Sequence, residues 1–402
     1  MPPLPADPRG SKPDALPEDI VARVEALLAE ARRAGASDVH LQPTADGLEL
    51  RWRIDGVLQP VALWPAAIAA KVVARLKVLA GLLTYRTDVP QEGRLRGAPG
   101  EVEMRVSTVP TLHGEKAVIR LFAGAGARSY SRLDDLGLPD EIREALRRLL
   151  GETSGAILLT GPAGSGKTTT IYACLHELAE ATQGRRSLVS LEDPIEMAVP
   201  GVSQSQVNPA AGFDLETGLR SLLRQDPEVI AVGEIRDRPT AEVAFQASLT
   251  GHLVLTTFHA GSAAGAVGRL LDMGIEPYVL RSGLLAVVGQ RLVRRLCACS
   301  RESEDPRLLL GLPVARARLA VGCPACRGTG YQGRLVLAEI LWPEPGEVGR
   351  AILARTDVGR LEAAAVAAGM VTRWQRALRA VEAGLTTPAE VRRVLGFADP
   401  WT

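Results

Sequence analysis

The segment Gly161–Thr170, which reads GPAGSGKTTT, restricts the possible folds of this chain more than any other. It matches the phosphate-binding pattern G-x-x-x-x-G-K-[ST]. A short apolar strand over 156–160 precedes it and a helix over 171–181 follows it, in the order that the pattern requires. Glycines let backbone N–H groups turn towards an anion, and the N-terminus of the following helix adds partial positive charge. The segment therefore predicts a nucleoside triphosphate site in an α/β domain.

Two side chains of this loop carry most of the expected chemistry. Lys167 supplies a cation for the β- and γ-phosphates, and the hydroxyl of Thr168 is suited to ligate Mg²⁺. The residues expected to surround the nucleotide are Gly161, Pro162, Ala163, Gly164, Ser165, Gly166, Lys167, Thr168 and Thr169.

Three more apolar strands follow, over 188–191, 229–232 and 253–257, with helical stretches between them. This alternation predicts a parallel sheet covered by helices on both faces. The carboxyl ends of parallel strands share one edge, where ligands bind in open α/β folds. The first two strands end in Glu192 and Glu234. We expect Glu234 to be the catalytic acid and Glu192 to act as a base, to orient water or to help hold Mg²⁺.

Two histidines flank the third strand. His252 precedes it and His259 follows it. A lone histidine is usually structural, but a pair at one strand is a candidate sensor of the γ-phosphate.

The first third of the chain has a different pattern. Six prolines within residues 1–17 indicate a disordered tail. A helical pattern then covers 20–35, and alternating strands with a hairpin turn at Asp55-Gly56 indicate a small α+β domain that ends near residue 126. Its other expected elements are strands over 38–42, 48–54, 101–108 and 116–122 and a helix over 66–83, followed by a connector over 124–131.

Several ordered motifs resemble those of the bacterial type II secretion and type IV pilus assembly ATPases. The segment 222–237 is similar to the family signature, 190–196 to its Asp box and 250–259 to its His box. The resemblance runs from about residue 18 to residue 397. Segments similar to the family's pre-catalytic domain are 36–43, 89–94, 104–110 and 114–116.

This resemblance implies a RecA-like P-loop NTPase domain preceded by a small PAS-like α+β domain. It implies a hexameric motor that uses ATP and Mg²⁺ to drive pseudopilus or pilus assembly. The motor would be cytoplasmic and attached to the inner membrane through platform proteins, and it would bind no specific nucleic acid.

The resemblance also assigns roles to individual residues. Glu192 and Glu196 would be Asp-box acids, and His252 and His259 would sense the phosphate. Three arginines of the pre-catalytic domain would approach the phosphates, since guanidinium groups suit phosphate oxygens. They are Arg94, Arg105 and Arg120.

The cysteines depart from the family pattern. Cys323-Pro-Ala-Cys326 is like the second half of a tetracysteine zinc module, whereas the first half reads Cys297-Ala-Cys299, one residue short. Residues i and i+2 of an extended segment point to opposite sides, so this loop must distort for both thiolates to bind one ion. We favour four-thiolate Zn²⁺ over reduced, metal-free thiols.

Two further departures concern the N-terminus and the signature. Where family members usually carry a further N-terminal domain that docks onto membrane partners, this sequence has about 17 residues, and Glu228 stands where the signature usually has Asp. The expected domains are a tail over 1–17, the pre-catalytic domain over 18–126, a linker over 127–139, the ATPase domain over 140–292, a cysteine module over 293–340 and a helical C-terminal region over 341–402.

Composition excludes other classes of protein. With 47 Lys+Arg against 46 Asp+Glu, the net charge of +1 argues against a general nucleic-acid binder. The longest apolar runs, such as 284–288, are too short for a transmembrane segment, and the N-terminus lacks a secretory signal. The alternatives are a type IV pilus or DNA-uptake motor, a P-loop kinase and a non-hydrolysing ring subunit. The kinase would leave the Asp and His boxes unexplained, and Lys167, Thr168 and Glu234 argue against the ring subunit.

Overall fold

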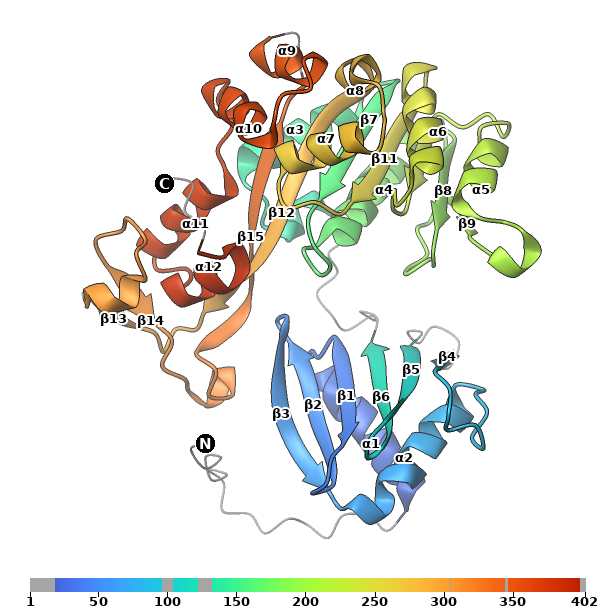
Figure 1. Ribbon diagram of the computed structural model, residues 1–402, viewed down its shortest axis with the longest axis vertical. Helices are drawn as coiled ribbons and strands as arrows, with labels where there is room; N and C mark the ends of the chain where they lie inside the picture. Colours follow the sequence, from blue (N-terminus) through green and yellow to red (C-terminus); the bar gives the residue numbers. More distant parts are fainter. Residues whose placement is uncertain (1–18, 96–103, 122–131, 304, 344–345, 398–402) are drawn as a thin grey trace. The chain divides into compact units, whose positions relative to one another are not determined.

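The computed structural model describes residues 19–95, 104–121, 132–303, 305–343 and 346–397 (Figure 1). The chain divides into two compact units, Met1–Arg128 and Ser129–Thr402. The expected tail over 1–17 and the expected connector over 124–131 lie outside the described residues.

The N-terminal unit is an antiparallel sheet with two helices on one face (Figure 1). The strand order is β3-β2-β1-β6-β5-β4, and all pairs are antiparallel. The elements are α1 (Ile20–Arg33), β1 (Asp38–Pro43), β2 (Leu48–Ile54), β3 (Val57–Trp64), α2 (Ala66–Leu79), β4 (Gln91–Leu95), β5 (Met104–Thr111) and β6 (Gly114–Leu121).

Alternating side chains hold the helices to this sheet. Leu50 and Ile119 are buried in a core that also contains Val24 of α1 and Val72 of α2. Helix α2 ends at Leu79, earlier than expected, because the chain turns back and the amide of Leu82 bonds to the carbonyl of Lys77. Strand β4 was not predicted, since its sequence QEGRL carries a single large apolar residue.

The C-terminal unit is built on a seven-stranded sheet with the order β15-β12-β7-β11-β10-β8-β9. Its elements as far as the last sheet strand are α3 (Asp140–Leu150), β7 (Gly155–Thr160), α4 (Lys167–Thr182), β8 (Leu188–Glu192), β9 (Ser203–Gln206), α5 (Leu215–Leu222), β10 (Val229–Val232), α6 (Arg238–Leu249), β11 (Leu253–Phe258), α7 (Ala263–Asp272), α8 (Pro277–Gly283), β12 (Leu284–Leu296), β13 (Arg301–Ser303), β14 (Ala317–Leu319) and β15 (Tyr331–Leu341).

The predicted parallel strands are present, but the sheet as a whole is mixed. Strands β8, β10, β11 and β7 pair in parallel, and β12 runs parallel to β7. Strand β15 is antiparallel to β12, which corrects the prediction of a purely parallel sheet. The reason is the cysteine segment: the chain leaves the sheet after β12, folds this segment and returns along β12 in the opposite direction.

Both faces of the sheet are covered, as predicted. Successive residues of β7 alternate between two cores: Leu158 packs with α6 and α7, and Leu159 packs with α3 and α4. Among the described residues, none of the helices combines the length and the apolar character needed to cross a bilayer.

Within the described part of the chain, four helices follow the sheet: α9 (Glu347–Leu353), α10 (Val358–Ala367), α11 (Arg373–Glu382) and α12 (Pro388–Leu395). The breaks expected at Gly369 and Gly384 fall between α10, α11 and α12. The last two helices share a core with the cysteine segment. Val314 of that segment and Val293 of β12 lie in one cluster with Trp374 of α11.

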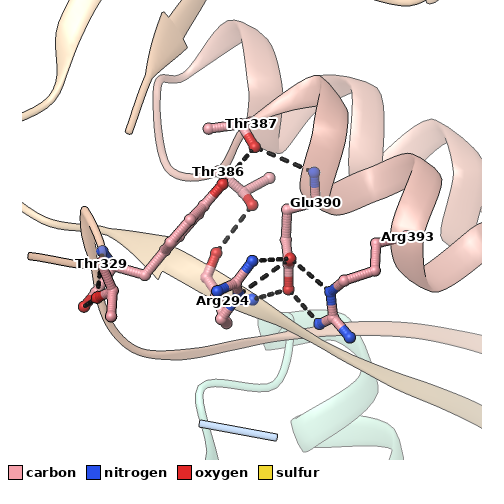
Figure 2. A network of polar contacts seen from close by, with 7 residues as sticks. Arg294, Thr329, Thr386, Thr387, Glu390 and Arg393 are labelled. Atoms are coloured by element: carbon pink, nitrogen blue, oxygen red, sulfur yellow. Dashed lines mark hydrogen bonds and ion pairs between the residues drawn. The ribbon is translucent and has the colours of Figure 1, made fainter. Parts of the chain in front are cut away.

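A buried charge network also ties α12 to the sheet (Figure 2). Glu390 of α12 accepts hydrogen bonds from the amide of Arg294 on β12 at 2.8 Å and from its guanidinium at 3.0 and 2.8 Å. Arg393 contacts the same carboxylate at 2.5 and 2.7 Å. Arg294 also lies over the ring of Tyr331, whose hydroxyl is 2.8 Å from that of Thr387. The C-terminal helices are thus fixed to the base of the cysteine segment.

A second buried ion pair lies in the N-terminal unit and generates a stability prediction. Lys77 is fully buried, and its ammonium is 2.7 Å from Glu115 and 2.6 Å from the carbonyl of Arg86. Removing one partner of a buried pair leaves an uncompensated charge, which typically costs about 3–5 kcal/mol. We expect Glu115→Ala to lower the unfolding free energy of this unit by that amount.

Urea unfolding of the full chain, followed by circular dichroism, measures this loss. Lys77→Met combined with Glu115→Ala removes both charges and should be less destabilising than Glu115→Ala alone. A double variant at least as unstable as the single one would contradict the assignment.

Candidate functional site

The predicted phosphate loop lies between the end of β7 and the start of α4. It spans Gly161–Gly166, and α4 begins directly at Lys167. Gly161 has φ +153°, and a Cβ there would lie 2.4 Å from the hydroxyl of Ser165 and 2.5 Å from the carbonyl oxygen of Gln290. Only glycine fits this first position, because the loop and β12 press against it from two sides.

Lys167 is buried and folded back onto the loop. Its ammonium donates to the carbonyls of Gly161 at 2.8 Å and Pro162 at 3.0 Å. Burial lowers the pKa of this amine below its usual value; Glu234 opposes the shift, and Arg291 adds to it. The amine thus lies inside the loop, where a phosphate would replace the carbonyls as its partner.

Gln290 supports the loop from the neighbouring strand β12. It is buried, and its amide donates to the hydroxyl of Thr170 on α4 at 3.0 Å. Sequence reasoning missed this residue. The available signal is a polar residue inside the apolar run LLAVVGQRLV over 284–293.

Glu234 and His259 meet at the sheet edge that carries the loop. Nε2 of His259 is 2.6 Å from Oε1 of Glu234, and Nε of Arg236 is 2.8 Å from Oε2. The hydroxyl of Thr257 donates to the carbonyl of Gly233 at 2.6 Å, which ties the ends of β10 and β11 together. A carboxylate held between an imidazole and a guanidinium group can accept a proton or orient water.

Glu192 is also at this edge, but its side chain is surrounded by protein donors. Its Oε1 accepts from the hydroxyl of Ser190 at 2.6 Å and from the amide of Gln204 at 3.0 Å, and its Oε2 accepts from the hydroxyl of Tyr172. Burial and the bond to Glu192 raise the pKa of the Tyr172 hydroxyl. Tyr172 was also missed, since an aromatic residue in a helix reads as part of the core.

The other two acids of the Asp box, Asp193 and Glu196, follow Glu192 along the chain. Glu196 is exposed, and its amide donates to the hydroxyl of Tyr172 at 3.0 Å. Asp193 is 3.5 Å from Arg236. A small cavity lies between α4 and the ends of β8, β10 and β11, lined by Thr168, Ile171, Tyr172, Leu175, Glu192, Ala231, Val232, Gly233 and Thr257.

The structure does not bring His252 to this edge. It lies at the start of β11, where its carbonyl accepts from the amide of Gly155 at the beginning of β7. Its Nδ1 is 3.1 Å from the carbonyl of Ala247, at the end of α6. Because His252 and His259 flank the whole length of one strand, only His259 can lie beside Glu234. Glu228 also lies at the opposite edge, at the start of β10 beside Arg186.

The three predicted arginines form one row across the N-terminal sheet. Arg94 on β4 is paired with Arg105 on β5, which is paired with Arg120 on β6. Arg120 is 3.2 Å from Asp38, and Arg105 is 4.0 Å from Glu92. The row lies on the face opposite α1 and α2, since the alternate residues are in the core. Their approach to a phosphate stays a prediction.

The four cysteines of the segment after β12 gather in one cluster. Their sulfur atoms all lie within 4.8 Å of one another. The Sγ–Sγ distances are 3.8 Å for Cys297–Cys323, 3.9 Å for Cys299–Cys326 and 3.7 Å for Cys323–Cys326. Tetrahedral Zn–S bonds of about 2.3 Å place sulfurs about 3.8 Å apart, so the donor set fits Zn²⁺.

A turn allows Cys297 and Cys299, which are separated by only one residue, to face the same ion. The amide of Ser300 bonds to the carbonyl of Cys297 at 3.0 Å, so residues 297–300 are not extended. Burial opposes ionisation of Cys326, but hydrogen bonds from the amides of Cys323 and Gly330 and with the thiols of Cys323 and Cys299 outweigh it and lower the pKa of its thiol to about 6. Such donors stabilise the thiolate, the form that binds metals.

Comparison with known sequences places this site in a family. The sequence model described as "Type II/IV secretion system protein" matches residues 16–393. The chain belongs to this family. The resemblance identified from the motifs is therefore confirmed, and the chain is a homologue of the type II secretion ATPases.

Three relatives show how far the similarity extends. The type II secretion system protein HxcR of Pseudomonas aeruginosa is 43% identical over 377 residues, which cover 93% of this chain and 77% of HxcR. The type II secretion system ATPase E of Vibrio cholerae is 44% identical over 334 residues, or 80% of this chain and 65% of that protein. The type IV pilus assembly ATPase PilB of Thermus thermophilus is 40% identical over 379 residues, or 92% of this chain and 42% of PilB.

Solved structures confirm the α/β fold. The pilus retraction motor PilT with bound ADP superposes with a TM-score of 0.62 at 24% identity, covering 94% of this chain and 97% of that one. The ATPase DotB of Legionella pneumophila gives a TM-score of 0.69 at 21% identity, covering 95% and 97%. This likeness concerns the fold alone.

The crowding at Gly161 predicts that the phosphate loop tolerates no side chain there. We expect Gly161→Ala to weaken ATP binding by about tenfold or more, because backbone strain of about 1–3 kcal/mol and two close contacts must be relieved. Titration with a fluorescent ATP analogue measures the affinity. Gly251→Ala is the control: Gly251 also has positive φ, +99°, but a Cβ there meets nothing within 4 Å. Equal affinities of the two variants would contradict the prediction.

Proposed function

We propose that this chain is the motor ATPase of a type II secretion system, which hydrolyses ATP to drive assembly of the pseudopilus. The observation that carries the proposal is the pairing of Glu234 with His259 at the sheet edge of the phosphate loop. Two relatives at 43% and 44% identity are named as type II secretion proteins, one of them as an ATPase. A nucleotide loop with an acid and a sensor at the same edge suits hydrolysis better than binding alone.

Each residue of the site has its own proposed role in hydrolysis. The amides of the loop and Lys167 bind the phosphates, and Thr168 would hold Mg²⁺, which would supply positive charge to the phosphate oxygens. Glu234 accepts a proton from the attacking water or orients it. His259 keeps Glu234 in place and detects the γ-phosphate through the same contact. The donors around Glu192 suit it to shaping the cavity beside Thr168 or to holding a water there.

ATP binding and hydrolysis are proposed to move the N-terminal domain against the C-terminal domain. In the proposed mechanism the C-terminal unit carries a RecA-like domain and the N-terminal unit a PAS-like domain, with boundaries near residues 126 and 140. Arg94, Arg105 and Arg120 approach the phosphates when ATP is bound, so hydrolysis releases one domain from the other. The motor works as a homo-hexamer in the cytoplasm, attached to the inner membrane by platform proteins.

A second candidate within the same family is assembly of a type IV pilus, including a DNA-uptake pilus. The 40% identity to PilB over 92% of this chain favours it as the runner-up. A non-hydrolysing ring subunit is disfavoured because Lys167, Thr168 and Glu234 are all present and the last is paired with His259.

The cysteine cluster is proposed to hold one structural Zn²⁺. All four sulfurs would bind it, which closes the site to water and suits a structural role rather than catalysis. The ion would brace the segment between β12 and β15.

Steady-state ATP hydrolysis tests the proposed function. Glu234→Gln should keep the affinity for Mg-ATP and lower kcat by about 10²–10⁴-fold, because general acid–base catalysis is lost while the phosphate loop is intact. Hydrolysis is measured by phosphate release, with Lys167→Ala as the blank.

Protein concentration is the second variable. Specific activity that rises with concentration supports the ring, whereas turnover by Glu234→Gln near the wild-type rate would show that another residue is the catalytic acid.

Metal analysis tests the zinc proposal. We expect one zinc per chain in freshly purified protein, and a lower melting temperature for Cys323→Ser, because metal binding contributes directly to the stability of such segments. Cys174→Ser is the control, since Cys174 is a buried thiol of α4 outside the cluster. Absence of zinc from the wild-type protein would end the proposal.

A further inference from the structure

One buried carboxylate, Glu339 of β15, joins two helices beside the nucleotide site. None of its side chain is exposed. Oε1 accepts from the amide of Ala263 at 2.9 Å, and Oε2 accepts from the amide of Arg373 at 3.0 Å. The guanidinium of Arg373 adds a bond to Oε1 at 2.9 Å. Ala263 and Arg373 are the first residues of α7 and α11, so Glu339 satisfies amides at two helix N-termini.

The loop that carries His259, residues 259–262, is held by charged side chains along its length. Arg269 donates to the carbonyl of His259 at 2.7 Å. Arg291 of β12 donates to the carbonyl of Gly261, also at 2.7 Å. Together with the bond from the α7 amide to Glu339, these contacts fix the loop in one conformation. The side chain of His259 leaves it towards Glu234.

Gly289 of β12 makes this arrangement possible. It is paired with Glu339 on one side and with Thr160, the last residue before the phosphate loop, on the other. A Cβ at position 289 would lie 2.9 Å from both Cγ and Oε1 of Glu339 and 3.3 Å from the amide nitrogen of Ala263. The carboxylate can therefore cross the strand to reach α7 only because this residue has no side chain.

We propose that Glu339 is a positioning residue for ATP hydrolysis, which holds the His259 loop against Glu234 and links it to the start of α11. The inference rests on the proposed function, since it assumes hydrolysis at Glu234. A carboxylate accepts hydrogen bonds through both oxygens, whereas glutamine accepts through one and presents donors at the other position. Glutamine at 339 would thus release either the loop or α11 at almost unchanged volume.

Glu390 provides a matched control. It too is buried and accepts from a backbone amide and from arginines, here Arg294 and Arg393, but these partners lie on β12 and α12 (Figure 2). In ATP hydrolysis by the full chain, Glu339→Gln should lower kcat by about 10- to 100-fold, the cost of a misplaced catalytic group. KM should stay within about twofold. Glu390→Gln should stay within about twofold of wild type in both constants, although it also loses a buried charge.

Equal loss of kcat in both variants would assign Glu339 a structural role only, and wild-type kcat in Glu339→Gln would overturn the proposal outright. If wild-type protein hydrolyses no ATP, the proposed function fails, and amide hydrogen exchange over residues 259–265 then decides the positioning. Faster exchange there in Glu339→Gln than in wild type and in Glu390→Gln supports it, and unchanged exchange overturns it.

Arg291→Lys covers the case in which Glu339→Gln does not fold. Arg291 is only half-buried, and lysine keeps the charge while losing the guanidinium fork that donates to the carbonyls of Gly261 and Gln290. A lower kcat at unchanged KM is expected, and wild-type constants would overturn the proposal.

Discussion

The parallel hydrogen-bond ladder of the C-terminal sheet is the constraint on which the site depends. Because β7 pairs with β11 through Thr160 and Phe258, the phosphate loop and His259 leave the sheet at the same edge. Strand β10 pairs with β11 on the side away from β7 and brings Glu234 beside His259. A shift of any one strand by two residues would move its catalytic side chain by about 6.6 Å, beyond hydrogen-bond reach. The register of the backbone strands therefore determines which side chains meet at the site.

The sequence predicted the parts of the site that local pattern determines. The phosphate loop, Glu234 and His259 each follow a short apolar strand, and this rule alone places them at one edge. The same rule places His252, one residue before the strand, at the opposite edge, and treating the two histidines as a pair overlooked this. A signature motif names residues by proximity in sequence, whereas an extended strand separates its two ends by its whole length.

The residues that sequence reasoning missed owe their roles to partners far away in the chain. Gln290 meets Thr170 across 120 positions, and Glu339 meets Ala263 across 76. Gln290 stands out as a polar residue in an apolar run, but nothing in the local composition of β12 or β15 shows which distant residue Gln290 or Glu339 contacts. The antiparallel β15 was missed for a similar reason, since its direction follows from the return of the chain after the cysteine segment. Long-range polar contacts of this kind have no periodic signal.

The cysteine segment leaves and rejoins the sheet through neighbouring residues, and this has an evolutionary consequence. Leu296 of β12 is paired with Tyr331 of β15, so the 34 residues between them form a closed excursion whose two ends are adjacent. Insertions and deletions inside such an excursion leave the spacing of the strands behind it unchanged. The short spacing between Cys297 and Cys299 is accommodated where it occurs, by the turn that ends at Ser300. Such changes in the segment therefore leave the nucleotide site, at the end of the neighbouring strand β7, with the same geometry.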